Sequence, residues 1–204
     1  MLKFLGMPLA AMLLLGAFFT PAARADSSDP AVAQVQGFYD ALLDSMKHAK
    51  ELGVQGRYDR LKPAVEASFD LRDMAALAVG PGWAAMSASD QDALLAAFER
   101  LTVANYAKNF DGYGGEKFVV DPATTPRGGD LVVQSKLVAP GQTVPFGYRL
   151  RQSGGSWKIL DIYLNGTISQ LAVQRSEFGA TLSAGGAPAL TRKLNAQADK
   201  LMGG

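Results

Sequence analysis

The stretch from Trp157 to Phe178, WKILDIYLNGTISQLAVQRSEF, combines three signals that together decide the fold. Its first part is rich in β-branched and aromatic residues on both faces, which predicts a strand covered on both sides. Asn165-Gly166 predicts a turn, and Thr167-Ile168-Ser169-Gln170 has the form of a capping box that begins a helix. We expect that helix to extend to about Leu182. A strand therefore leads almost directly into a helix.

Three further strand patterns precede this one, in the runs KFVVD, DLVVQSKLVA and VPFGYRLRQ. Turns rich in Pro, Gly, Asp and Ser separate the runs, as expected for consecutive antiparallel strands. In the third run Phe146, Tyr148 and Leu150 alternate with glycine and arginine. One face of the sheet is therefore expected to be apolar and the other exposed to solvent. Helices are expected to cover the apolar face.

Helical patterns occupy the chain before and after the strands. Before the strands we expect helices from Pro30 to about Glu51, from Arg57 to Ser68 with a break at Pro63, from Phe69 to Gly80, and from a capping box at Ser89 to about Phe110. After them, an interruption at residues 184–188 precedes a last helix. The order of helices, strands and helices predicts an α+β domain, with a curved antiparallel sheet of about four strands wrapped by helices.

The N-terminal residues 1–25, MLKFLGMPLAAMLLLGAFFTPAARA, predict a cleaved signal peptide. Lys3 precedes an apolar run, and Ala23-Arg24-Ala25 has the small-x-small form that signal peptidase accepts. The apolar run is shorter than the ~20 residues that cross a bilayer. An uncleaved membrane anchor is the alternative. Residues 26–204 are then expected to form one exported domain.

Composition excludes several functional classes. Without residues 1–25 the chain carries 18 basic and 19 acidic residues, a balance that lacks the electrostatic footprint of a nucleic-acid-binding protein. It also lacks the basic excess of a protein held on anionic lipid by charge. The absence of cysteine from the sequence excludes disulfides and thiol chemistry. Stability must therefore come from the apolar core.

The sequence offers little for catalysis or metal binding. Its one histidine, His48, lies in a polar stretch and is expected to be solvated. The carboxylate pairs Asp70/Asp73 and Asp90/Asp92 fall at predicted helix starts, where acids stabilise the exposed N–H groups. No set of His and Cys ligands suits zinc. We expect no enzyme, metal or cofactor; the alternative is a lipid-modifying enzyme that uses Asp161.

The large apolar residues support two interpretations. They either fill the space between helices and sheet completely, or they surround a pocket of the ~300–1,000 Å³ that small-molecule sites occupy. The hydroxyl of a buried tyrosine needs a hydrogen-bond partner, and the mouth of a pocket would supply one. The sequence does not choose between a packed core and a pocket.

The motifs and their order resemble the MlaC family, also called the toluene-tolerance auxiliary family, over about residues 31–201. The resemblance rests on Phe69-Asp70-Leu71, Leu77-Ala78-Val79-Gly80 with Trp83, the Gly112-Tyr113 turn, Val144 to Leu150, Trp157 to Ile162, and Arg175-Ser176-Glu177-Phe178. The LAVGPGW and DGYGGEKF forms are similar to the hopanoid-biosynthesis-associated, HpnM-like branch. Asn165 to Leu171 departs from the common family form, which leaves the cargo open between hopanoid and phospholipid.

This resemblance implies a monomeric periplasmic carrier that shields the apolar part of a membrane lipid in a pocket. It implies an inner-membrane lipid transporter as partner, of the MCE/ABC type or, for the hopanoid branch, the RND type, and shuttling of the lipid between inner- and outer-membrane partners in a direction that the sequence leaves open. The residues expected to line the lipid pocket are Phe69, Leu77, Trp83, Phe98, Leu101, Tyr106, Phe146, Tyr148, Leu150, Ile162, Leu164, Leu171, Arg175 and Phe178. A module that bridges envelope proteins and carries no lipid remains the alternative.

Arg175 is the unusual member of this set. A helical projection that begins at Ile168 places it in the middle of the apolar side, where a guanidinium needs partners. It either pairs with protein groups and is structural, or it binds a headgroup at the pocket mouth through its planar fork.

Overall fold

The computed structural model describes residues 29–203, and the predicted signal peptide lies outside this range. The elements are α1 (Pro30–Lys47), α2 (Ala49–Ser68), α3 (Leu71–Val79), the 3₁₀ helix η1 (Gly80–Ala85), α4 (Ala88–Asn109), β1 (Lys117–Arg127), β2 (Asp130–Ala139), β3 (Gln142–Ser153), β4 (Ser156–Leu164), β5 (Ile168–Ser169) and α5 (Gln170–Met202). The α+β prediction is confirmed. Among the described residues, no helix is both long and apolar enough to cross a membrane.

The helix starts follow from local hydrogen bonding. Asp29 accepts the N–H of Ala31 at 2.9 Å and so caps α1, with proline at the first helical position. The start predicted for α4 at Ser89 is wrong by two residues: the cap is Ser87, whose hydroxyl oxygen accepts the N–H of Asp90. Serines lie at both positions in the sequence, and the earlier one begins the helix.

The predicted break at Pro63 is also wrong, because α2 continues through this residue. Pro63 has no N–H to donate to the carbonyl of Asp59. Both residues lie on the exposed side of the helix, where water can donate this hydrogen bond instead. The irregular residue in α2 is Gly53, with φ of 59°. The interruption predicted at residues 184–188 is present as a kink at Gly185 and Gly186 within α5.

The five strands form one antiparallel sheet in the order β1-β2-β3-β4-β5. Four strands are long, and the fifth has two residues. Val133 on β2, Tyr148 on β3 and Ile162 on β4 lie opposite one another across the sheet. Strand β1 is longer than predicted and contains a bulge between Val120 and Thr124.

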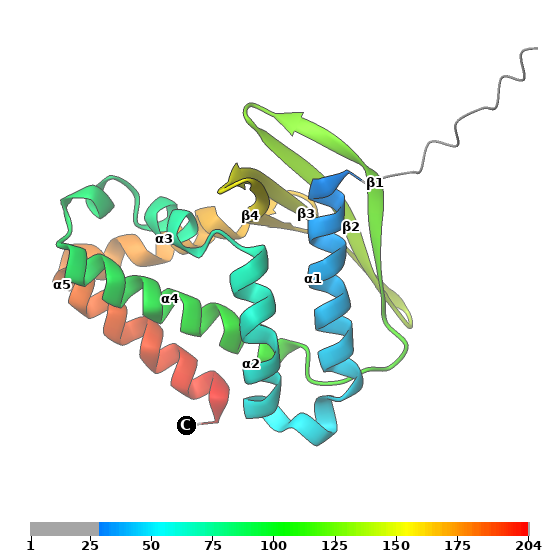
Figure 1. The fold of residues 1–204 in the computed structure, drawn as a ribbon. Helices are drawn as coiled ribbons and strands as arrows, with labels where there is room; N and C mark the ends of the chain where they lie inside the picture. The colour runs from blue at the N-terminus through cyan, green and yellow to red at the C-terminus, as the bar shows by residue number, and fades with distance from the viewer. Residues whose placement is uncertain (1–28, 204) are drawn as a thin grey trace, which may run out of the picture.

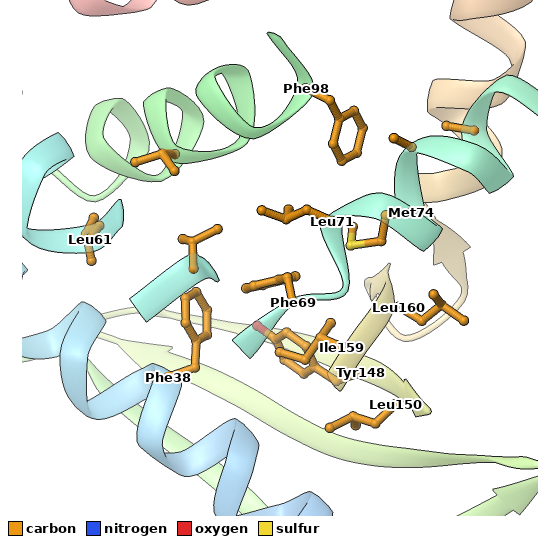
Figure 2. Close-up of a cluster of buried hydrophobic side chains, with 14 of the residues drawn as sticks. Phe38, Leu61, Phe69, Leu71, Met74, Phe98, Tyr148, Leu150, Ile159 and Leu160 are labelled. Atoms are coloured by element: carbon orange, nitrogen blue, oxygen red, sulfur yellow. The ribbon is translucent and has the colours of Figure 1, made fainter. Parts of the chain in front are cut away.

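The helices meet one face of the sheet in two different ways. Figure 1 shows α1 beside β1 and β2, whereas α4 and the second half of α5 run side by side away from the sheet. Figure 2 shows the core between them, with Phe38 from α1, Leu61 from α2, Phe98 from α4 and Ile159 from β4 pointing into one interior. Phe38 is 1% exposed, and its ring lies edge-on to that of Phe69 at 5.0 Å.

Candidate functional site

An apolar cavity of about 320 Å³ lies where the helices diverge from the sheet. Residues of α3, α4, β3, β4 and the first turns of α5 surround it. We call this space the apolar cavity. Its lining consists of Phe69, Met74, Thr102, Asn105, Tyr106, Asn109, Phe110, Phe146, Ile162, Leu164, Gln170 and Gln174.

A series of aromatic rings separates the cavity from the packed core. The rings of Tyr106 and Phe110 stack at 5.9 Å, and the edge of Phe38 meets Tyr106 at 5.1 Å. Phe110 in turn approaches Phe118 at 6.2 Å. Aromatic pairs of this kind add about 0.5–1.5 kcal/mol beyond their buried area, so these contacts stabilise the wall on this side.

The polar side chains of the lining are neutral. Thr102 and Asn105 lie one above the other on α4, and Gln170 and Gln174 lie one turn apart on α5. Burial raises the pKa of the Tyr106 phenol, which therefore stays protonated and neutral. None of the twelve lining residues is acidic or basic. The cavity therefore favours apolar or neutral groups over ions.

A second space of about 400 Å³ lies on the other side of Phe110. It is bounded by the glycine-rich turn Asp111 to Glu116, by Met46 of α1 and by Leu137 and Val144 of the sheet. We call it the turn hollow. Asn109 and Phe110 line both spaces. These two residues therefore lie between the two spaces.

The predicted pocket residues fall into three groups. Phe69, Tyr106, Phe146, Ile162 and Leu164 line the apolar cavity. The structure places six others in or against the packed core instead: Phe98, Leu101, Tyr148, Leu150, Leu171 and Phe178. Leu77, Trp83 and Arg175 line a separate hollow between α3, η1 and α5.

The expected burial of Arg175 is wrong. Helix α5 begins at Gln170, and Ile168, from which the helical projection was drawn, belongs to β5 and is 48% exposed. The inward positions of the first turns are Leu171, Gln174 and Phe178, so Arg175 lies beside this stripe on the exposed surface. Within residues 29–203 no salt bridge or hydrogen bond holds its guanidinium.

The guanidinium of Arg175 packs against Gly80 instead. The φ of Gly80 is 78°, a conformation that favours glycine, and a Cβ atom there would lie 3.1 Å from Nη2 of Arg175, so the exposed guanidinium would have to move slightly. The hollow around them has a volume of about 420 Å³ and includes Trp83 and Arg151. Arg175 is therefore placed outside the apolar cavity.

The sequence interpretation missed the arginine that is buried. Arg57 is 7% exposed and donates from Nε to the carbonyl of Ala107 at 2.7 Å and from Nη1 to that of Ala49 at 2.9 Å. These carbonyls lie at the end of α4 and the start of α2. Arg57 thus joins two helices. Gly53 and Gly56 precede Arg57, which was therefore predicted to begin a separate helix, and this concealed its role.

Phe110, Gln170 and Gln174 were also missed as lining residues. Phe110 ends the predicted helix, and its apolar character gave a signal that could have been used. The glutamines resemble ordinary surface residues of a helix, and nothing in their sequence neighbourhood marks them. They face the cavity because the first turns of α5 pack against β4.

Asp161, the candidate catalytic carboxylate, is 3% exposed and lies outside the cavity lining. Its Oδ1 accepts the backbone N–H groups of Ile162 and Leu171, at 2.8 and 3.0 Å, and its Oδ2 accepts the hydroxyl of Ser169 at 2.6 Å. Both carboxylate oxygens are therefore used to join β4 to the start of α5. This arrangement is structural and leaves no oxygen directed at a substrate.

The remaining candidates also have structural surroundings. Nδ1 of His48 lies 2.8 Å from the carbonyl oxygen of Asp44, at the junction of α1 and α2. Within residues 29–203 no three His, Cys, Asp or Glu side chains lie close enough together to hold a metal ion. Among the described residues, the apolar cavity is the feature best suited to a ligand.

The fold and the cavity define an α+β protein with an apolar space between a sheet and its covering helices. The chain belongs to the MlaC family, described as MlaC protein, which matches residues 36–196. A solved structure of the phospholipid-binding protein from Ralstonia solanacearum, in complex with a phospholipid, is similar with a TM-score of 0.74. The two share 22% sequence identity over 84% of this chain and 98% of that one. No curated protein sequence matches this chain.

Proposed function

We propose that this protein is a periplasmic lipid carrier, which holds the apolar part of a membrane lipid and transfers it between inner-membrane and outer-membrane partners. The apolar cavity carries this proposal, because its lining is uncharged and most of its lining residues are aromatic or aliphatic. Membership of the MlaC family and the similar fold of the Ralstonia solanacearum protein, which binds a phospholipid, support it.

The physical basis of such transport is partitioning, with no bond made or broken. Each buried CH₂ group favours the bound state by about 0.8 kcal/mol. A cavity of about 320 Å³ holds only part of a lipid with long chains. The turn hollow beyond Phe110 supplies further volume, so loading is expected to move that ring. Release then requires a partner that competes for the lipid or opens the helices. We propose a transporter of the inner membrane as that partner.

The export of the chain belongs to the same proposal, because a carrier of this kind acts between two membranes. The predicted signal peptide supports it. The hopanoid cargo implied by the HpnM-like resemblance is the finer version of the proposal. A phospholipid is the alternative cargo.

The test is a mass measurement on protein purified from a periplasmic fraction without detergent. We expect the native mass to exceed the denatured mass by that of a lipid, and solvent extraction to release it for identification. The structure of the released molecule distinguishes a hopanoid from a phospholipid. Equal masses, together with no uptake from labelled vesicles, would refute the carrier function and favour a bridging module.

A further inference from the structure

A hollow of about 420 Å³ between α3, η1 and α5 has the composition of a protein-docking surface. We call it the η1 hollow. Its lining includes Leu77, which is 38% exposed, and the half-buried Trp83. Helix η1 itself consists only of Gly, Pro, Trp and Ala, and none of its six residues is buried. Apolar residues that remain exposed in a cluster mark interaction sites, and tryptophan and arginine are enriched among the residues that carry binding energy in protein interfaces.

The η1 hollow contains a cation without a partner. Arg151 is satisfied, because its Nε donates to Asp130 at 2.7 Å and its Nη1 lies 3.9 Å from a carboxylate oxygen of Asp73. Arg175 also lines the hollow, and within residues 29–203 it makes no salt bridge or hydrogen bond. The hollow therefore presents the positive charge of Arg175 to an incoming anion.

The guanidinium of Arg175 is already oriented for a planar anion. Its Nε, Cζ and Nη2 atoms lie 3.3, 3.3 and 3.1 Å from the position of a Cβ atom at Gly80. Such similar distances place the face of the planar group over Gly80 and leave its edges, which carry the N–H donors, open. These edges match a carboxylate through two parallel hydrogen bonds. A group that is held in place beforehand loses less entropy on binding.

The charges of the hollow favour a protein carboxylate over a membrane surface. Asp73 lines the hollow and is half exposed, so an anionic bilayer would bring many phosphates against this carboxylate. Residues 26–204 also lack the basic excess that holds a protein on anionic lipid. One aspartate or glutamate beside an apolar side chain needs only a single cation and an apolar surface, which Arg175 and Trp83 supply.

The η1 hollow and the apolar cavity lie on two sides of the first turns of α5. Gln174 lines the cavity, and its neighbour Arg175 lines the hollow. Among residues 170–184 only Phe178 is buried, and the kink at Gly185 ends this segment. A segment with few buried contacts moves at low cost in free energy. A partner bound at Arg175 can therefore displace a wall of the cavity.

We propose that the η1 hollow is the docking site of the partner protein that receives or supplies the lipid. The partner contributes an exposed segment with an aspartate or glutamate, which pairs with Arg175, beside an apolar side chain, which packs against Trp83 and Leu77. Docking there moves the first half of α5 and opens the apolar cavity. The inference rests on the proposed carrier function and assigns the surface and the chemistry of its partner.

The test compares lipid transfer to membranes with and without proteins. The mature wild type is loaded from liposomes of radiolabelled bacterial lipid and then mixed with native inner-membrane or outer-membrane vesicles of the bacterium that encodes it. Liposomes of the lipids extracted from these vesicles are the protein-free acceptors. Sedimentation of the acceptors measures the transferred label. We expect transfer to the native vesicles of at least one membrane to be about ten-fold faster than to the matching liposomes.

Arg175→Glu reverses the unpaired charge of the hollow. This variant is expected to slow transfer to native vesicles by about ten-fold, and to leave loading and transfer to liposomes unchanged because Arg175 lies outside the apolar cavity. Arg175→Lys keeps the charge without the planar fork and should retain part of the rate. Arg192→Glu, at an exposed arginine in the second half of the same helix, is the matched control and should transfer like the wild type.

The apolar part of the hollow has its own pair of variants. Leu77→Ser removes an exposed apolar side chain and should slow transfer to native vesicles by about five-fold. Val119→Ser makes a similar change on β1, away from the hollow, where the valine is 44% exposed. It should leave the transfer rate unchanged.

Each other outcome contradicts a defined part of the proposal. A wild type that takes up no lipid from liposomes and carries none from the periplasm would overturn the carrier function. Loading followed by equal transfer to native vesicles and liposomes, or equal transfer by Arg175→Glu and wild type, would overturn the docking site and leave the carrier function standing. Slower transfer of Arg175→Glu to liposomes would instead assign the hollow to the membrane surface. A dimer in light scattering that Arg175→Glu dissociates would instead assign it to a second copy of this chain.

Discussion

The interior is packed differently at its two ends, beneath α1 and beneath the start of α5. Beneath α1, Tyr39 stacks on Phe118 at 4.2 Å and its hydroxyl bonds to Ser135 at 2.7 Å, so ring and hydroxyl are both satisfied. Burial raises the pKa of Tyr39 to about 12, which keeps this hydroxyl neutral. Beneath the start of α5, Phe146 faces a cavity and Gln174 has an unpaired oxygen.

This difference separates a part of the molecule built for stability from a part built for binding. Helix α1 lies along the sheet and packs against β1 and β2 over most of its length, up to the turn hollow beside Met46. Helices α4 and α5 leave the sheet at its β4 end, and the residues between them keep unsatisfied packing and hydrogen-bonding capacity.

The largest expected effect is the difference in stability loss when one phenylalanine from each end is replaced by alanine. Phe38→Ala should lower the free energy of unfolding by about 4 kcal/mol, because it removes a ring that is fully surrounded. Phe146→Ala should cost only about 1.5 kcal/mol, since its half-buried ring already faces a cavity. Urea unfolding of both variants measures the contrast, and equal losses would show that the two ends are packed alike.

In the sheet between the two ends, two arginine side chains donate hydrogen bonds to one buried carboxylate. Asp130 is 3% exposed and accepts hydrogen bonds from Arg151 and Arg149, which hold its pKa below the usual value. Asp130→Asn should lower the free energy of unfolding by about 2 kcal/mol at neutral pH. A pKa lowered by folding gives stability that is present above the unfolded value of about 3.9 and lost as the pH falls through the folded value.

The pH dependence separates this effect from simple loss of packing. The difference in free energy of unfolding between the wild type and Asp130→Asn should be constant between about pH 6 and pH 8. It should shrink below about pH 4, as the wild-type carboxyl takes up its proton. Unfolding curves at several pH values measure it. A difference that is independent of pH down to pH 2 would contradict the assignment, and lipid loading should be unchanged at neutral pH.

Phe110 tests the boundary between the apolar cavity and the turn hollow. Phe110→Ala should join the two spaces and strengthen the binding of a long-chain fluorescent fatty acid by about five-fold, whereas Phe110→Trp should weaken it by a similar factor. Such changes correspond to about 1 kcal/mol. Fluorescence titration measures both variants. If they bind alike, the Phe110 ring does not limit the cavity.

The sequence predicted the elements better than the cavity, for a physical reason. Alternation at Phe146, Tyr148 and Leu150 is a local property of a strand, and it correctly predicted which face is covered. A cavity depends on the angle at which helices leave the sheet, which residues far apart in the chain determine together. Tyr148 and Phe146 lie two residues apart with the same pattern, yet one is in the core and the other lines the cavity.

The inward face of α5 was predicted about two-thirds of a right angle away from its true position. A projection that counts the small residues Ala172 and Gly179 as apolar centres on Arg175, but both are exposed in the structure. The inward residues Leu171, Gln174 and Phe178 centre on a direction about 60° away, at 100° per residue. Gln174 thus takes the inward position that had been given to Arg175.

The smallest expected effect concerns the arginine that attracted attention in the sequence. Arg175→Ala should change the free energy of unfolding by less than about 0.5 kcal/mol and leave lipid loading unchanged, because the side chain is exposed and lies outside the apolar cavity. Arg57→Ala, at the buried arginine, should cost about 3 kcal/mol by removing hydrogen bonds to two carbonyls. Urea unfolding and native mass measurements compare the two. If Arg175→Ala folds normally but binds less lipid, this arginine binds the lipid headgroup and the binding site lies nearer to η1.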